Sequence, residues 1–236
     1  MLSPSLMRLA APLAAVTALL GACGGAATPV TSDPPTAAAT TSTPAPSATA
    51  SATTVTTGTW TVSNTSKATV RVREQLVGVN LPSDAVLVAT GATGTFVLKD
   101  DGTFSPDSKI TFDVTTLASD QRNRDDFVKM DTLQTRQFPT ATFVPTKTSG
   151  LTLPLPASGD FTFKLTGQIT IHGKTKDVTF DVTAHRSGNE LTATTTASPT
   201  WKFADFGMTA PSVPFRVVSI VDEIRLVVDL VATVKA

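Results

Sequence analysis

The sequence predicts an all-β domain, a sandwich or a barrel, that follows an export signal and a linker. Two segments, residues 161–171 and 178–184, alternate apolar and polar side chains with a period of two, as half-buried strands do. Further short runs of this kind recur between turn signals across residues 58–236, and only residues 120–133 interrupt them with a helical pattern. Many short strands separated by turns are typical of these two architectures.

Residues 1–22 have the layout of a secretory signal peptide. The segment up to Arg8 carries one positive charge, and residues 9–20 form an apolar run that is rich in Leu, Ala and Val. That run is shorter than the roughly 20 apolar residues that cross a bilayer as a helix. A charged start, a short apolar stretch and then small residues indicate a signal that is removed after export.

Cys23 is the predicted lipidation site. The sequence Leu20-Gly21-Ala22-Cys23 resembles a bacterial lipobox, which implies diacylglycerol on the Cys23 sulfur and cleavage just before it. Cys23 is the only cysteine, so it cannot form an internal disulfide, and a free thiol is unusual in an exported protein. The alternative is an ordinary secretory signal with an incidental cysteine. Lipidation would place the protein at the outer face of a bacterial membrane, in the cell envelope or periplasm.

Residues 23–57 form a predicted tether. They are dominated by Ala, Thr, Ser and Pro, with Asp33 as the one charged residue. Such a composition buries too little apolar surface to offset the entropy of ordering the chain, so we expect disorder. A flexible coil of this length spans about 30 Å on average.

The strand candidates of the domain at residues 58–236 follow one another with turn signals between several of them. They are residues 60–63, 68–74, 85–90, 94–98, 109–114, 141–145, 161–171, 178–184, 190–197 and 224–234. Residues 172–176 contain a glycine and are short enough for a hairpin turn, which makes the strands on either side antiparallel neighbours.

Residues 120–133 are expected to form a short helix beside the sheet or over one end of it. Phe127, Met130 and Leu133 would lie on one side of it. Asp120 is a candidate N-cap, because aspartate is favoured at that position.

Several blocks together resemble the YceI-like, or polyisoprenoid-binding, proteins from Trp60 to the carboxyl end. They are Val72-Arg73-Glu74-Gln75-Leu76, Arg124-Asp125, Phe138-Pro139-Thr140-Ala141-Thr142-Phe143, Leu165-Thr166-Gly167, Thr170-Ile171-His172-Gly173-Lys174-Thr175-Lys176 and Ala204-Asp205-Phe206-Gly207-Met208. The resemblance implies a lipocalin-like antiparallel barrel of eight strands with an apolar pocket for an isoprenoid or similar amphiphile. It also implies export and, in many members, a homodimer. One departure is Glu74, where many members have a histidine, so a head-group contact there would differ.

The pocket candidates are apolar-face residues of several predicted strands, since a barrel of about eight strands holds one small ligand. They are Phe112, Phe161, Phe163, Leu165, Ile169, Phe180, Val182 and Leu226. The alternative for each is a place in a solid core. Arg71 and Arg73 share one strand face and are head-group candidates, with a solvated outer face as the alternative.

Charge and chemistry exclude several functions. The 19 basic and 19 acidic residues balance, so nothing predicts a nucleic-acid partner. His172 and His185 are the only histidines, both expected at the surface, there is no tyrosine, and neither a metal-ligand spacing nor a nucleophile elbow occurs. We therefore expect no catalysis, no metal and no cofactor, although Asp205 near a second acid would reopen the question. The expected partner is an isoprenoid or fatty amphiphile. The alternative class is a tethered interaction module whose barrel is filled.

Overall fold

The computed structural model describes residues 58–212 and 217–235. The predicted signal peptide, Cys23 and the tether lie outside these residues. The compact unit spans Ala50–Ala236, and every described strand finds its partners within it. Within the described part of the chain, no helix has both the length and the apolar character needed to cross a membrane.

Within residues 58–212 and 217–235, ten strands, all antiparallel, form the sheet. Their bounds are β1 Trp60–Val62, β2 Lys67–Leu76, β3 Ser83–Ala89, β4 Thr93–Phe96, β5 Lys109–Asp113, β6 Thr140–Ser149, β7 Ser158–Ile171, β8 Lys174–Ser187, β9 Glu190–Ala197 and β10 Val217–Val234. Each of the ten predicted strands is confirmed, and β6 to β8 and β10 extend beyond the predicted bounds.

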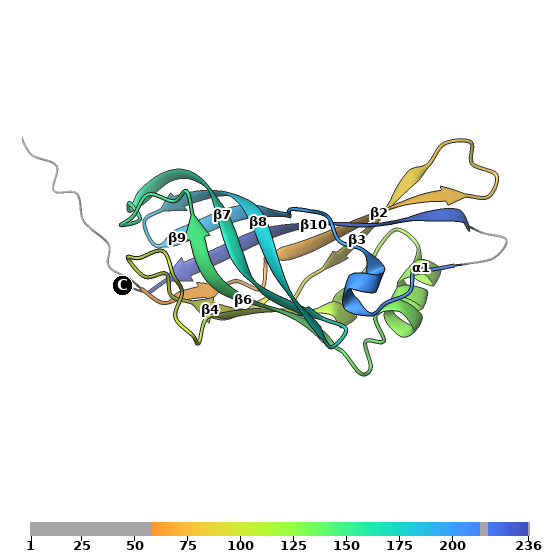
Figure 1. Cartoon of the computed structure of the whole chain (residues 1–236), viewed down its shortest axis with the longest axis horizontal. Coiled ribbons are helices and arrows are strands. Elements are labelled where there is room, and N and C mark those ends of the chain that lie inside the picture. Colours follow the sequence, from red (N-terminus) through yellow and green to blue (C-terminus); the bar gives the residue numbers. More distant parts are fainter. Residues whose placement is uncertain (1–57, 213–216, 236) are drawn as a thin grey trace, which may run out of the picture. The chain divides into compact units, whose positions relative to one another are not determined.

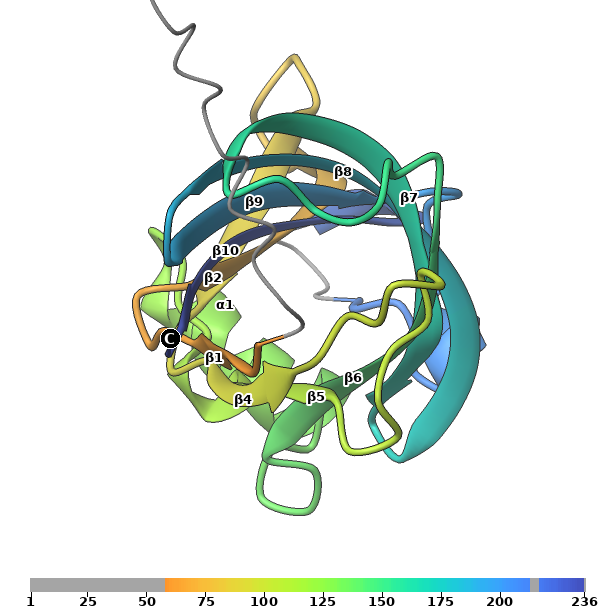
Figure 2. The ribbon, with the colours of Figure 1, turned by 90° about the vertical axis from the view of Figure 1, so that its left-hand side faces the viewer.

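Eight of these strands close into a barrel (Figure 2). Their order is β1-β4-β5-β6-β7-β8-β9-β10, and the pairing of Trp60 with Val234 joins β1 back to β10. The predicted eight-stranded antiparallel barrel is therefore confirmed. The long β10 continues past β1 and pairs with β2 from Asp229 to Val217, and β3 follows β2 (Figure 1). We call the end of the barrel near β1 the closed end and the end at the β2–β3 hairpin the open end.

Alternation along the strands decides which side chains point inward. In β8, Val178, Phe180, Val182 and Ala184 are buried, whereas Asp181 and Thr183 between them are exposed. In β9 the outward positions are mostly threonines, whose branched side chains suit a pleated surface. The inward positions of β8 and β9 are therefore mostly apolar.

The β7–β8 turn consists of two residues, His172 and Gly173, with φ angles of 49° and 70°. Two successive positive φ values match the twist of a tight hairpin and favour glycine at one position. A Cβ atom on Gly173 would also lie 2.7 Å from the Phe138 ring. The predicted hairpin is confirmed, and Gly173 is required for both reasons.

The predicted helix forms as two short segments, α1 Arg122–Phe127 and the π-helical η2 Val128–Thr132. The predicted cap is wrong: Gln121 occupies the N-cap, and Asp120 instead forms an ion pair with Arg124 at 2.7 Å. The expected apolar side is also partly wrong. Met130 is 59% exposed, because the wider π turn brings Thr132 inward in its place. Two 3₁₀ segments complete the fold, η1 Val114–Thr116 and η3 Phe203–Phe206.

The closed end is filled by side chains. Trp60 stacks on Phe96 with ring centroids 6.2 Å apart, and the Arg186 guanidinium lies 5.0 Å from the Trp60 ring centroid. Arg186 is 2% exposed and donates to the carbonyl oxygens of Leu155, Pro156 and Gly188, and its burial lowers its pKa. This end of the barrel is a solid core.

Candidate ligand-binding cavity

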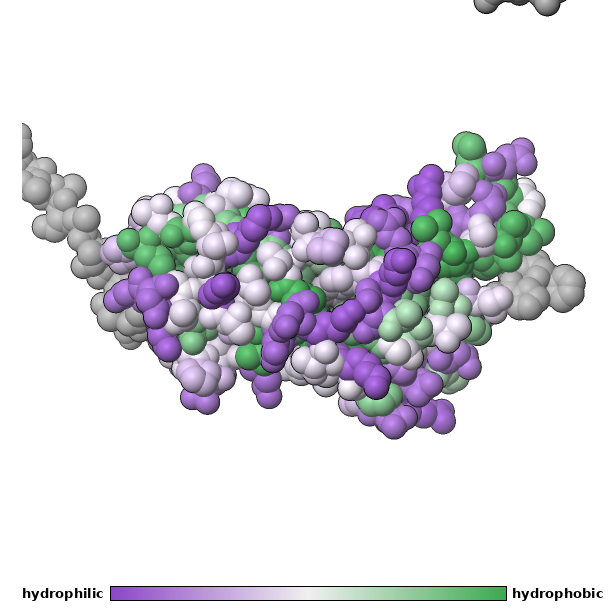
Figure 3. Space-filling model, viewed as in Figure 1, coloured by the Kyte–Doolittle hydropathy of each residue, from purple (hydrophilic) through white to green (hydrophobic). Residues whose placement is uncertain are grey.

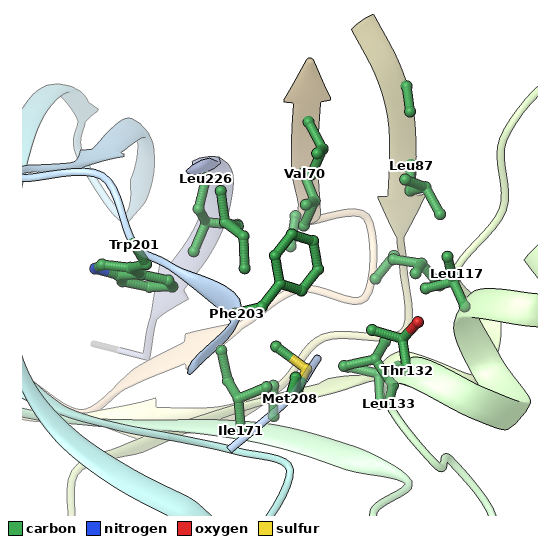
Figure 4. Close-up of a pocket in the computed structure, with 18 of the residues that line it drawn as sticks. Val70, Leu87, Leu117, Thr132, Leu133, Ile171, Trp201, Phe203, Met208 and Leu226 are labelled. Carbon is green, nitrogen blue, oxygen red and sulfur yellow. The ribbon is translucent and has the colours of Figure 1, made fainter. Parts of the chain in front are cut away.

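A cavity of about 1230 Å³ occupies the barrel between the filled end and the open end (Figure 4). Most of its lining is aliphatic or aromatic, as ligand pockets usually are. The apolar side chains that line it include Val70, Val72, Leu87, Ile110, Phe112, Leu117, Phe127, Leu133, Phe143, Leu165, Ile169, Ile171, Phe180, Trp201, Phe203, Phe206, Met208, Ile224 and Leu226.

An aromatic wall closes the side of the cavity formed by β6, β8 and η3. Phe143 meets Phe180 edge to face at 5.3 Å, Phe180 meets Trp201 at 6.1 Å, and Trp201 meets Phe206 at 5.3 Å between centroids. The Trp201 backbone pairs with Ile224 of β10, and Phe203 N–H donates to Asp222 at 2.9 Å. These bonds hold η3 against the barrel, so its aromatic side chains point inward.

Gly167 in β7 makes room for this wall. A Cβ atom on Gly167 would lie 2.6 Å from the Phe143 ring and 2.4 Å from the Val144 carbonyl oxygen. The missing side chain lets the Phe143 ring lie across β7 and reach Phe180. The resemblance block at residues 165–167 therefore has a physical role in shaping the cavity.

The open end of the cavity carries its polar groups. Glu74 of β2 is 5% exposed, and its Oε1 accepts from Arg124 Nη2 at 2.6 Å. Arg124 also donates to Asp120 at 2.7 Å. Both Glu74 and Arg124 line the cavity, so an ion pair with little solvent exposure faces the apolar chamber.

The start of α1 is fixed by a second set of hydrogen bonds. The Ser119 N–H and hydroxyl donate to Asp125 at 2.8 Å and 2.6 Å. The two residues of the Arg124-Asp125 block thus have different partners: Arg124 joins the helix to β2, and Asp125 holds the preceding loop. Arg122 is exposed.

Five of the eight predicted pocket residues line the cavity, namely Phe112, Leu165, Ile169, Phe180 and Leu226. The remaining three, Phe161, Phe163 and Val182, do not line it. They point inward as predicted, but they lie further toward the closed end, where Phe163 pairs with Val182 and Phe161 with Ala184. The filled-core alternative applies to that end only.

Arg71 and Arg73, the predicted head-group residues, do not line the cavity either. They alternate with the buried Val72 and Glu74, so they lie on the outer face of β2. Arg73 pairs with Asp84 at 3.4 Å, and Arg225 of β10 donates to the same carboxylate at 2.7 Å. The hydrogen bond from Arg225 is the main cause that lowers the pKa of Asp84.

The histidines and Asp205 have structural partners. His185 is exposed and pairs with Asp160 at 2.7 Å, as expected of a surface residue. His172 is only partly exposed, which corrects the expected surface position: it packs against Phe138 and its Nδ1 bonds the Phe206 carbonyl at 3.1 Å. Asp205 pairs with Lys176, and the hydrogen bond from Lys176 lowers the pKa of Asp205. No cluster of potential metal ligands occurs among the described residues.

Sequence reasoning missed the Glu74–Arg124 pair and the contributions of Trp201, Phe203 and Met208. Glu74 was noted only as a departure from the family pattern. The resemblance at residues 204–208 rests on sequence alone, and it does not predict that the side chains of η3 point inward. The alternation of β2 places Glu74 on the same face as Val72, which is a signal that the side chain points inward.

A closed antiparallel barrel with an apolar cavity at one end defines a lipocalin-like class of protein. The model of the YceI-like domain matches residues 48–232. The chain therefore belongs to the YceI-like domain family, as the sequence blocks indicate.

Curated relatives of this chain include UPF0312 proteins of Pseudomonas. The protein of Pseudomonas putida strain F1 is 36% identical over 132 residues, which cover 50% of this chain and 64% of the relative. The protein of Pseudomonas fluorescens strain SBW25 is 37% identical over 132 residues with the same coverage. The chain thus spans less than two thirds of the length of these relatives.

Solved structures share the fold at low sequence identity. A polyisoprenoid binding domain from Saccharophagus degradans, implicated in plant cell wall breakdown, aligns with a TM-score of 0.56 at 11% identity and covers 75% of this chain and 98% of that one. Burkholderia cenocepacia BcnA aligns with a TM-score of 0.52 at 22% identity, covering 71% and 96%. Both comparisons support the barrel architecture.

Proposed function

We propose that this protein binds the apolar chain of an isoprenoid or similar amphiphile in the barrel cavity, reversibly and without changing it chemically. The cavity is the observation that supports the proposal, because it joins a large apolar chamber to polar groups that include the Glu74–Arg124 pair at the open end. One solved structure with this fold is a polyisoprenoid binding domain, which agrees with the proposed ligand class.

The size of the cavity fits a long chain. At roughly 30 Å³ for each methylene-sized group, the share of liquid volume that one water molecule takes, a cavity of about 1230 Å³ has room for some tens of carbon atoms. Each buried methylene contributes about 0.8 kcal/mol, so burial alone gives firm binding. The alternative, an interaction module with a filled barrel, disagrees with the cavity in this half of the interior.

The polar pair selects the head group. Glu74 neutralises Arg124, and together they offer an acceptor and donors at the open end of the cavity. An added negative charge would approach the Glu74 carboxylate, and removing water from a second anion is costly. We therefore propose a neutral hydroxyl-type head group in preference to a carboxylate or phosphate.

The proposal includes a membrane anchor on Cys23 and a place at the outer face of a bacterial membrane. It rests on the lipobox-like sequence at residues 20–23 and on the lone cysteine. Cys23→Ala should abolish the labelling of the protein by radioactive palmitate, which reports the anchor independently of any other membrane contact. Palmitate labelling of Cys23→Ala at the wild-type level would contradict the anchor.

Ligand binding is tested with residues 24–236, one fluorescent probe and two competitors, an isoprenoid alcohol and palmitate. Fluorescent cis-parinaric acid reports occupancy of the cavity, and geranylgeraniol, a C20 isoprenoid alcohol, competes with it. The expected result is saturable binding of one probe per chain, displaced by the alcohol at lower concentration than by palmitate. An absence of saturable binding for both classes would contradict the proposed function.

A further inference from the structure

Five of the six large apolar side chains that are most exposed among the described residues lie at the open end, and the sixth is Met130. Val77, Val79 and Leu81 lie in the β2–β3 hairpin loop, and Val218 and Val221 lie at the start of β10. Leu81 is 76% and Val218 66% exposed. We name these five residues the apolar rim, and Figure 3 shows apolar colour over the projecting hairpin at this end of the molecule.

The rim is one surface, because β2 and β10 are paired where it forms. Val217 pairs with Leu76 and Ser219 with Gln75, which places Val218 beside the hairpin that carries Val77. The loop at residues 77–82, Val-Gly-Val-Asn-Leu-Pro, contains no charged residue. Exposed apolar groups gathered in this way mark an interaction site.

The rim is continuous with the cavity. Val77 and Val79 of the rim also line the cavity. Val217, the residue before Val218 in β10, lines the cavity as well. An apolar chain that enters over the rim would therefore stay in contact with apolar side chains until it reaches the chamber. Leu81 and Val218 do not line the cavity, so they serve the outer surface alone.

We infer that the apolar rim docks on a lipid bilayer and that the ligand enters or leaves the cavity there. This inference rests on the proposed function, since it names the surface through which the proposed site exchanges its ligand. The rim inserts a few apolar side chains among the lipids, and the rest of the barrel stays in water.

The chain outside the described residues is long enough for such docking. β1 pairs with the end of β10 that is opposite to the rim, and β10 has 18 residues, or about 60 Å at ~3.3 Å per residue. At roughly 3.3–3.6 Å per residue, residues 24–57 reach at most about 115 Å. An anchor at Cys23 therefore permits the rim to face the membrane that holds the protein.

Charge does not explain the docking, because basic and acidic residues are mixed near the open end. Arg124 pairs with Glu74 and Asp120, and Asp84 accepts from Arg73 and Arg225. Docking should therefore occur on uncharged vesicles and change little between low and high salt, since screening weakens only charge interactions.

The test uses residues 24–236, without the anchor, and vesicles of phosphatidylcholine and phosphatidylethanolamine. We expect the wild-type protein to float with the vesicles at both 50 mM and 500 mM salt. The double variant Leu81→Ser and Val218→Ser should bind them at least tenfold more weakly and extract vesicle-borne cis-parinaric acid at least tenfold more slowly. Its equilibrium binding of the same probe, delivered from ethanol, should equal that of the wild type.

A matched control replaces Leu151 by serine, because Leu151 is a partly exposed apolar residue in the β6–β7 loop, at the closed end. That variant should float and extract the probe as the wild type does. Saturable probe binding without any vesicle binding would overturn the docking inference and leave the proposed function intact. A wild-type dimer that the double variant converts to monomers, with no vesicle binding, would overturn it in favour of self-association. Loss of saturable probe binding in the wild type would overturn the proposed function itself.

Discussion

Single residues decide what the cavity accepts. Leu226 points into the chamber beside Val70 and Phe203 (Figure 4). Phe163 of β7 packs against the core without lining the chamber. The two positions share the apolar interior but differ in depth. A larger side chain at position 226 can therefore fill part of the cavity without changing Glu74 and Arg124 at its entrance.

Leu226→Trp should lower the affinity for geranylgeraniol about tenfold, because the larger ring displaces at least two methylenes of ligand at about 0.8 kcal/mol each. The displacement titration with cis-parinaric acid measures it. Phe163→Trp is the matched control and should bind as the wild type does, provided that both variants unfold at similar urea concentrations. Equal affinities for all three proteins would remove Leu226 from the ligand site.

Glu74→Gln should change the preference for the head group. The variant leaves Arg124 with less compensating charge, so the affinity for palmitate should rise relative to geranylgeraniol by about tenfold, which is ~1.4 kcal/mol and within the range for a charged hydrogen bond. The ratio of the two affinities is the readout, because a general loss of stability would lower both. An unchanged ratio would show that the pair serves only to hold α1 to β2.

Elements at the open end are held together by ion pairs as well as by the sheet. Asp84 of β3 joins Arg73 of β2 and Arg225 of β10, and its pKa is lowered mainly by the bond from Arg225. A carboxylate whose pKa is lower in the folded than in the unfolded state stabilises the protein above the unfolded pKa, about 3.9. That contribution is lost as the pH falls through the folded value.

Asp84→Asn should therefore reduce the free energy of unfolding at pH 7 by about 0.2–1 kcal/mol, the range measured for ion pairs near the surface. The difference from the wild type should shrink as the pH is lowered below about 4, because the wild-type carboxylate becomes protonated. Urea unfolding at pH 7, 5 and 3 measures it. A difference that stays constant or grows toward pH 3 would contradict the role of this ion pair.

The sequence was most informative about the strands and least informative about depth and long-range contacts. Period-two alternation marks Phe161, Phe163 and Leu165 as inward-facing, and all three are. Only Leu165 lines the cavity, because depth depends on how each strand is staggered against its neighbours, and no local pattern records that register. The alternation of β2 likewise turns Glu74 inward, but its partner Arg124 is 50 residues away in the sequence.

The whole molecule divides its interior between stability and binding. Trp60, Phe96 and Arg186 fill the closed end, and the chamber occupies the other part of the barrel. Core packing at one end compensates for the surface left unpacked at the other. The two halves should therefore respond independently to mutation.

Trp60→Ala should lower the free energy of unfolding by about 3–5 kcal/mol, the usual cost of truncating a buried tryptophan. Its affinity for geranylgeraniol should stay within twofold of the wild type at 10 °C, where the folded state still dominates. Urea unfolding and the displacement titration measure the two effects on one protein sample. A folded variant with lost affinity would contradict the division of the interior.

Native mass spectrometry of residues 24–236, purified from bacteria without detergent, shows whether the cavity holds an amphiphile. We expect an adduct of close to one copy per chain, which organic extraction identifies as an isoprenoid or fatty amphiphile and which Leu226→Trp reduces. A protein mass without any adduct, unchanged after incubation with geranylgeraniol and palmitate, would contradict it.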